Sequence, residues 1–120
     1  MSRDDVAWET SESPEARAAA DGEVRRIVAE LAARGATRVV LFGSRARGTA
    51  RQGSDADLLV VMPCPPEESF PRRIARVWQE LRPRMAVDIL VYTPEEFAEI
   101  ATSRTFVREA LAEGRVLHAV

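Results

Sequence analysis

Two short apolar runs, joined by a turn-forming stretch, constrain the fold of this chain more than any other feature. The runs are Arg38–Phe42 (RVVLF) and Leu58–Met62 (LLVVM). Short continuous apolar runs rich in β-branched residues are typical of buried strands. Gly43-Ser44 follows the first run directly, and the second begins after the acids Asp55 and Asp57. The sequence therefore predicts two strands, with a Gly-Ser turn after the first and two carboxylates at the head of the second.

Hydrophobic periodicity and capping signals predict the other elements. Apolar residues recur at helical spacing after Ser13-Pro14 until Gly35, with a break at Gly22 as an open alternative. We expect helices over 13–35, 70–81 and 103–113, a further helix starting at Thr93, and strands over 37–42, 57–62, 85–92 and 115–120. This order predicts an α/β (α+β) chain with a small mixed β-sheet flanked by helices. We expect a flexible leader over 1–12 and one domain over 13–120.

Composition excludes several functional classes. A chain of 120 residues is long enough for one core and too short for two. Its formal charge of −2 gives no basis for direct nucleic-acid binding. All 17 basic residues are arginines, which excludes a lysine-dependent phosphate loop or Schiff base. Because Cys64 is the single cysteine and no apolar run approaches the ~20 residues that span a bilayer, we expect a cytoplasmic protein with no membrane partner.

The Gly-Ser turn has the chemistry of a phosphate site. A turn that enters a helix exposes backbone N–H groups, Gly43 allows close approach, and Ser44 adds a hydroxyl. Arg45 and Arg47 add positive charge, so we take all four as candidate nucleotide-binding residues. A plain strand-to-helix turn with solvated arginines is an equally open interpretation of this segment alone. A Walker A loop is excluded because the required lysine does not follow Gly48.

Three aspartates carry the most specific signal. Residues i and i+2 of a strand project from one face, so Asp55 and Asp57 are expected to point together. Single acids at strand heads are often caps, but two on one face repel each other unless they share a cation such as Mg²⁺. Asp88 interrupts an apolar strand, where a buried charge is costly. It either pairs with an arginine or lies on the face of the other two acids, and we favour the second interpretation.

Taken together, these residues resemble a known family. The segments GSRARGTARQGSDADLLV and VDILVY are similar to the motifs of the minimal nucleotidyltransferase (MNT) branch of the DNA polymerase β-like superfamily. The resemblance spans about residues 24–118 and implies the polymerase β-like nucleotidyltransferase fold. Transfer of a nucleotidyl group depends on in-line positioning and charge neutralisation, which agrees with these residue types.

The resemblance also implies a role for each motif residue. Asp55 and Asp57 would bind two Mg²⁺ ions, and Asp88 would help to bind one of them and deprotonate an acceptor hydroxyl. Gly43 and Ser44 would hold the terminal phosphates of the nucleotide. The implied reaction moves AMP from ATP to a hydroxyl acceptor and releases pyrophosphate.

Family members of similar size suggest a partner. They often act as antitoxins beside a HEPN ribonuclease toxin, which they bind as a hetero-oligomer and adenylylate (AMPylate) on a tyrosine. The resemblance therefore implies a HEPN-type toxin as partner. Two alternatives stay open: a non-catalytic module that neutralises its partner by docking alone, and a small-molecule nucleotidyltransferase.

Several other residues are expected to have structural roles only. We expect Trp78 in the core and Cys64 as a small packed side chain. His118 is a lone histidine on a predicted edge strand, and lone histidines rarely form a site. Arg73 and its neighbours Arg72 and Arg76 are expected to form a solvated basic helix face.

Overall fold

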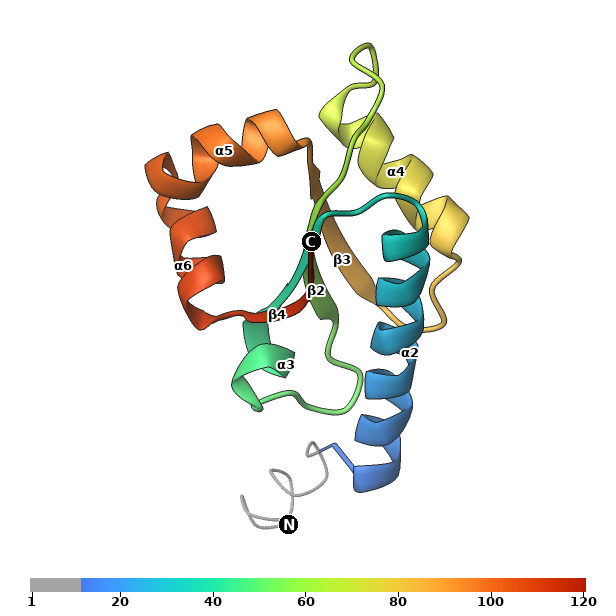
Figure 1. The fold of residues 1–120 in the computed structure, drawn as a ribbon. Coiled ribbons are helices and arrows are strands. Elements are labelled where there is room, and N and C mark those ends of the chain that lie inside the picture. The colour runs from blue at the N-terminus through green and yellow to red at the C-terminus, as the bar shows by residue number, and fades with distance from the viewer. Residues whose placement is uncertain (1–11) are drawn as a thin grey trace.

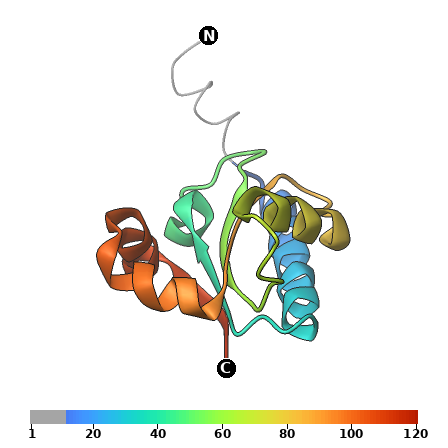
Figure 2. The same ribbon diagram turned by 90° about the horizontal axis from the view of Figure 1, so that it is seen from above.

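The computed structural model describes residues 12–120, in which helices cover both faces of one four-stranded sheet (Figure 1, Figure 2). The strands are β1 (Arg38–Phe42), β2 (Ala56–Val61), β3 (Val87–Tyr92) and β4 (Arg115–Ala119). The helices are α2 (Pro14–Ala33), α3 (Gly43–Arg47), α4 (Phe70–Leu81), α5 (Pro94–Ser103) and α6 (Thr105–Glu113). The predicted mixed sheet flanked by helices is confirmed. The predicted leader over 1–12 lies, except for Glu12, outside the described residues.

The sheet has the order β3-β2-β1-β4, and its register brings the sequence motifs together. Strand β1 is antiparallel to β2 and β4, whereas β2 and β3 are parallel and connected through α4. Phe42 at the end of β1 is paired with Asp57 of β2. Asp57 is in turn paired with Asp88 of β3. Because paired residues project from the same face of a sheet, these three side chains lie side by side at one end of it.

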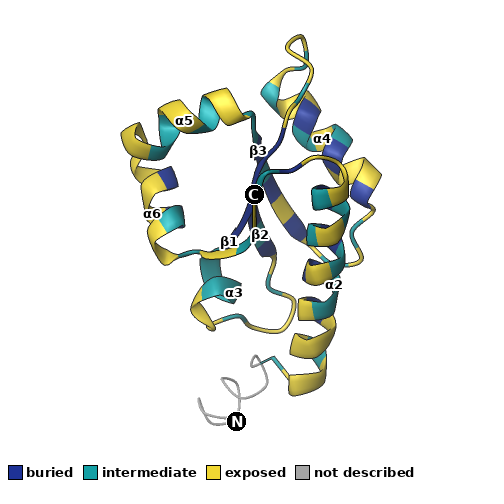
Figure 3. Ribbon diagram, viewed as in Figure 1, coloured by how far each residue is buried: buried dark blue, intermediate teal, exposed yellow. Residues whose placement is uncertain are grey.

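Each face of the sheet packs against its own pair of helices (Figure 2). Helices α2 and α4 cover one face with the larger apolar cluster, which includes Ile27, Leu31, Leu58, Val77 and Ile89. Helices α5 and α6 cover the other face with a smaller cluster that includes Val40, Leu59, Val61, Val107 and Leu111. The central strands β1 and β2 are the most buried part of the described chain, whereas the edge strand β4 is largely exposed (Figure 3). Asp57 and Asp88 belong to the face of α5 and α6, since side chains alternate along each strand.

Helix α2 is continuous, and the break considered at Gly22 is absent from it. Ser13 caps its first turn by accepting a hydrogen bond from the backbone N–H of Ala16 at 3.1 Å, and Pro14 is its first residue, as predicted. A glycine inside a helix costs only about 1 kcal/mol relative to alanine, which the packing of Ile27 and Leu31 outweighs. None of the helices within residues 12–120 is long and apolar enough to cross a membrane.

Helix α4 contradicts two predictions. Trp78 was expected in the core, yet 45% of it is exposed, because the smaller Val77 and Leu81 face the sheet. Arg73 was expected on a solvated face, yet only 5% of it is exposed. Its guanidinium pairs with Glu96 of the α5 capping box and donates to the carbonyl oxygen of Val91 at 3.2 Å. Arg73 therefore ties α4 to the end of β3 and the start of α5.

Candidate active site

Gly43 joins β1 to α3 and lies directly against Asp57 of the neighbouring strand. Its φ angle is +74°, in the left-handed region that favours glycine. A Cβ atom at this position would overlap Oδ2 of Asp57 and lie 3.2 Å from its Cγ. Glycine at this position therefore lets the Asp57 carboxylate lie against the turn.

Asp57 and Asp88 line one cavity of about 500 Å³ on the α5/α6 face of the sheet. Gly43 and Arg47 line it with them. Asp57 is partly buried and Asp88 is exposed. Burial raises the pKa of Asp57, and the negative charges of Asp88 and Asp55 raise it further, while Arg47 acts in the opposite direction. The cavity therefore holds a carboxylate whose charged form lacks a sufficient counter-charge.

Asp55 is placed less centrally than its motif partner. It is exposed and directly precedes β2, which begins one residue before the predicted strand over 57–62. It lies outside the set of described residues that line the cavity, although its charge acts on Asp57. The structure therefore brings Asp57 and Asp88 into the cavity and leaves Asp55 beside it.

The acids fit a hard divalent cation by their donor chemistry. Mg²⁺ prefers carboxylate oxygens. A bound cation would stabilise the charged form of Asp57 against burial and against the repulsion from Asp88 and Asp55, which together raise its pKa. Within residues 12–120, no three His, Cys, Asp or Glu side chains are grouped closely enough to hold a metal ion by themselves. The protein thus offers an adjacent carboxylate pair with a third acid nearby, and a bound triphosphate would have to supply further oxygens.

Helix α6 forms the part of the cavity wall that sequence reasoning missed. Phe106, Glu109 and Glu113 of this helix line the cavity. The ring of Phe106 contacts that of Phe42 edge to face, with 5.8 Å between centroids and 87° between planes. Glu113 pairs with Arg47 at 3.6 Å, which connects α6 to α3. The helical spacing of these α6 residues was visible in the sequence, but nothing there placed α6 against the motif.

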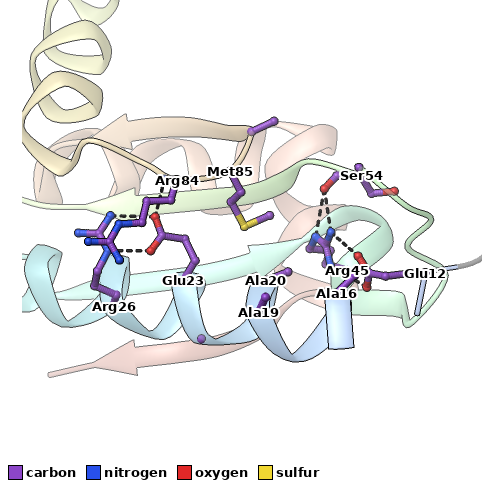
Figure 4. Close-up of a pocket in the computed structure, with 13 residues that line it drawn as sticks. Glu12, Ala16, Ala19, Ala20, Glu23, Arg26, Arg45, Ser54, Arg84 and Met85 are labelled. Carbon is purple, nitrogen blue, oxygen red and sulfur yellow. Dashed lines mark hydrogen bonds and ion pairs between the residues drawn. The ribbon is translucent and has the colours of Figure 1, made fainter. Parts of the chain in front are cut away.

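Arg45 is engaged elsewhere, beside a second and larger cavity of about 790 Å³ between α2 and the loops at 53–54 and 84–86 (Figure 4). Its guanidinium forms an ion pair with Glu12 at 2.7 Å and donates to the carbonyl oxygen of Ser54 at 3.0 Å. Arg45 thus holds the loop that leads into Asp55. The predicted nucleotide contact of Arg45 would require these bonds to break. Of the two arginines, the structure places only Arg47 at the cavity of Asp57 and Asp88.

The larger cavity is a weaker candidate for chemistry. Its acids are hydrogen-bonded to its arginines, as Figure 4 shows for Glu23 with Arg26 and for Glu12 with Arg45. Hydrogen bonds from Arg26 lower the pKa of Glu23 to about 2, against the opposing effect of burial.

Ser44 is the remaining predicted phosphate ligand and lies in α3. Its backbone carbonyl accepts a hydrogen bond from the backbone N–H of Thr49 at 2.9 Å.

Comparison with known proteins identifies the domain family of the chain. A family model for the nucleotidyltransferase domain matches residues 22–118, which is most of the chain and includes both motifs. The chain belongs to the nucleotidyltransferase domain family. No curated protein matches it.

Two solved structures resemble this nucleotidyltransferase domain. A candidate nucleotidyltransferase from Sulfolobus solfataricus is 31% identical, with a TM-score of 0.52 over 65% of this chain and 70% of that one. A toxin-antitoxin structure with AMP-PNP is 17% identical, with a TM-score of 0.51 over 80% of this chain and 73% of that one. The second likeness is one of fold alone.

Proposed function

We propose that this nucleotidyltransferase domain transfers AMP from ATP to a hydroxyl group of a partner protein, with magnesium as cofactor. The observation that carries this proposal is the pairing of Asp57 with Asp88 in a cavity whose turn residue, Gly43, leaves room for the Asp57 carboxylate. Membership of the family supports the reaction class.

Each residue has a role in this proposal. Asp55, Asp57 and Asp88 would hold up to two Mg²⁺ ions, which when bound supply positive charge to the triphosphate and the acceptor oxygen. Gly43 and Ser44 would bind the terminal phosphates through the start of α3, with Arg47 neutralising part of their charge. Asp88 is exposed in the cavity and would accept the proton of the acceptor hydroxyl.

The step itself is an in-line displacement at the α-phosphorus. A bond forms from the acceptor oxygen to this phosphorus, and the bond to the bridging oxygen of the β-phosphate breaks. Pyrophosphate leaves with that electron pair, and AMP stays on the acceptor. The chain's contribution is orientation and charge placement, since it forms no covalent intermediate.

We further propose that the acceptor is a tyrosine of a HEPN ribonuclease toxin and that the protein acts as its antitoxin in the cytoplasm, within a hetero-oligomer. The structural neighbour named as a toxin-antitoxin with AMP-PNP supports a toxin partner and an adenine nucleotide at the level of the fold. The motif residues quoted above support the same family branch.

Incubation with α-labelled ATP, Mg²⁺ and a co-purified partner tests the catalytic proposal. Wild-type protein should label the partner, and Asp57→Asn and Asp88→Asn should each abolish labelling while circular dichroism stays native. Asp21→Asn, at an exposed position of α2, is the matched control and should keep full labelling. Full labelling by both site variants would exclude the proposed chemistry.

A docking-only antitoxin is the second candidate. It is favoured by one observation, that the carboxylates in residues 12–120 form no closed metal group on their own. In that case a variant with both Asp57→Asn and Asp88→Asn would still protect cells from the toxin. Loss of protection in this variant, with the complex still formed, would exclude docking as the mechanism.

A further inference from the structure

Helix α6 presents a stripe of exposed side chains to the cavity of the candidate site. The stripe consists of Phe106, Glu109 and Glu113, all of which line the cavity and are exposed. Their spacing of three and four residues places them on one face of the helix. Val107 and Leu111 of the same helix pack into the apolar cluster against the sheet. The α6 stripe therefore lies outside the core. Glu113 is held by Arg47 at 3.6 Å at the exposed edge of the cavity, and Phe106 and Glu109 face the space beside this ion pair.

The charges of the cavity divide it into two sides. Of the described residues that line it, four are acids and one is a base. The base, Arg47, is the last residue of α3, and its positive charge favours a phosphate on that side of the cavity. Glu109 and Glu113 lie on α6, and their charge repels a polyphosphate. The nucleotide is therefore expected on the α3 side, which leaves the α6 stripe to the second substrate.

Phe106 gives the stripe an apolar contact point. About half of it, 53%, is exposed, although an aromatic side chain gains about 1.5–3 kcal/mol from full burial. Its edge-to-face contact with Phe42 holds the ring at the cavity rather than in open solvent. Rigid aromatic side chains at the centre of a recognition surface commonly supply a large share of its binding energy.

We propose that the α6 stripe is the docking wall for the acceptor, and that it selects an aromatic hydroxyl within a positively charged segment of the partner protein. This inference rests on the proposed function, because it describes the surroundings of the acceptor hydroxyl. Phe106 contacts the acceptor ring, since aromatic pairs attract beyond their buried area. Glu109 and Glu113 attract the arginine or lysine side chains that flank it, and charge complementarity of this kind also rejects acidic segments.

Short fluorescent peptides test this selectivity directly. The probes carry tyrosine between arginines, tyrosine between glutamates, or serine between arginines. Their binding to the full chain is measured by anisotropy with Mg²⁺ and α,β-methylene-ATP, whose α–β bridge cannot be cleaved in the proposed step. The tyrosine peptide with arginines should bind at least about fivefold tighter than either other peptide, from two surface charge pairs or one aromatic contact. Equal binding of the three, or binding of none, would overturn the inference.

Substitutions then locate the contact. The double variant Glu109→Gln, Glu113→Gln should bind the arginine-flanked tyrosine peptide about fivefold more weakly. Glu67→Gln, Glu99→Gln removes the same charge at exposed positions outside the set lining this cavity and should bind like wild type.

A further variant separates acceptor recognition from base recognition. Phe106→Leu keeps an apolar side chain and should weaken binding of the tyrosine peptide about three- to tenfold, with little effect on AMP-PNP. If it weakens AMP-PNP and spares the peptide, the ring serves the nucleotide base and the inference is wrong. Should Phe106→Leu fail to fold, the glutamate double variant tests the same wall without changing the ring.

Transfer of AMP to the same peptides, followed by mass spectrometry, separates this inference from the proposed function. Equal transfer to both tyrosine peptides would support the reaction and overturn the selectivity. Selective binding without transfer would support the α6 stripe as a docking wall and overturn the catalysis.

Discussion

Replacement of Gly43 by alanine tests the geometry of the site most sharply. The substitution has two effects. The left-handed φ of +74° at this position destabilises an alanine by about 1–2 kcal/mol. In addition, the new Cβ atom would overlap the Asp57 carboxylate. The carboxylate must therefore move away from the turn. Since a misplacement of about 1 Å at a reacting centre can cost about 100-fold in rate, we expect Gly43→Ala to lose at least that much transfer activity.

Gly48→Ala is a matched control within the same segment. Gly48 has a φ of +77°, and a Cβ built on it meets nothing within 4 Å. It should therefore share the backbone cost of about 1–2 kcal/mol and spare the site. Both variants should lower the melting temperature by several degrees, given about 4 °C or more per kcal/mol for a domain of this size.

The assay combines thermal melting with Mg²⁺-ATP binding by calorimetry and with transfer to a labelled acceptor. Both alanine variants have the same backbone cost, so it cancels when the two are compared. The remaining difference in Mg²⁺-ATP binding and in transfer rate measures the effect of displacing the Asp57 carboxylate. If Gly43→Ala had a Mg²⁺-ATP affinity and a transfer rate within a few-fold of those of Gly48→Ala, the close approach of Gly43 to Asp57 would not matter for function.

Three further outcomes are expected. Burial and the neighbouring acids raise the pKa of Asp57, so the folded state loses stability as pH rises from 3.8 through that raised value. Asp57→Asn should therefore have a higher melting temperature than wild type at pH 7 without Mg²⁺. Below pH 3.8, where the Asp57 carboxyl is protonated, the two proteins should melt at the same temperature. Glu23 is the opposite case, because its pKa is lowered from 4.5 to about 2. Its charged form therefore stabilises the folded state fully above pH 4.5. The difference in melting temperature between wild type and Glu23→Gln should vanish as pH falls from 4.5 to about 2. Arg45→Leu should weaken Mg²⁺-ATP binding and lower the melting temperature, because it frees the loop before Asp55 and removes the shorter of the two ion pairs of Glu12. Arg108→Leu, at an exposed position, should change neither property. Equal behaviour of the two variants would refute the positioning role of Arg45.

Local signals predicted the framework of the fold well. Runs of β-branched residues identified β1 and β2, and the Ser13 and Thr93 caps identified the starts of α2 and α5. The interpretation that placed Asp88 on the same face as Asp57 also agrees with the register of β2 and β3, in which the two residues are paired. These features depend on neighbours in the sequence, which is why a single sequence could reveal them.

Features that depend on packing between distant elements were missed. Arg45 and Arg47 are two residues apart in a short helix, and only the fold decides that one contacts Ser54 and the other the Asp57 cavity. Likewise, Phe106 and Glu109 have the spacing of an ordinary solvated helix face until α6 is placed beside β1. Arg73 was misassigned for the same reason, since its partner Glu96 lies on another helix.

The antiparallel pairing of Phe42 with Asp57 has a consequence for how proteins of this kind diverge. The strand ladder, rather than the intervening loop, fixes the distance between the glycine turn and the acid. Residues could accordingly be gained or lost around positions 49–53 during evolution without disturbing the geometry of the candidate site, provided that the pairing was kept. Distant homologues can therefore differ in the number of residues between β1 and β2 and still keep the pairing of these strands. Such homologues would be missed by a motif with a fixed spacing between the glycine turn and the acid.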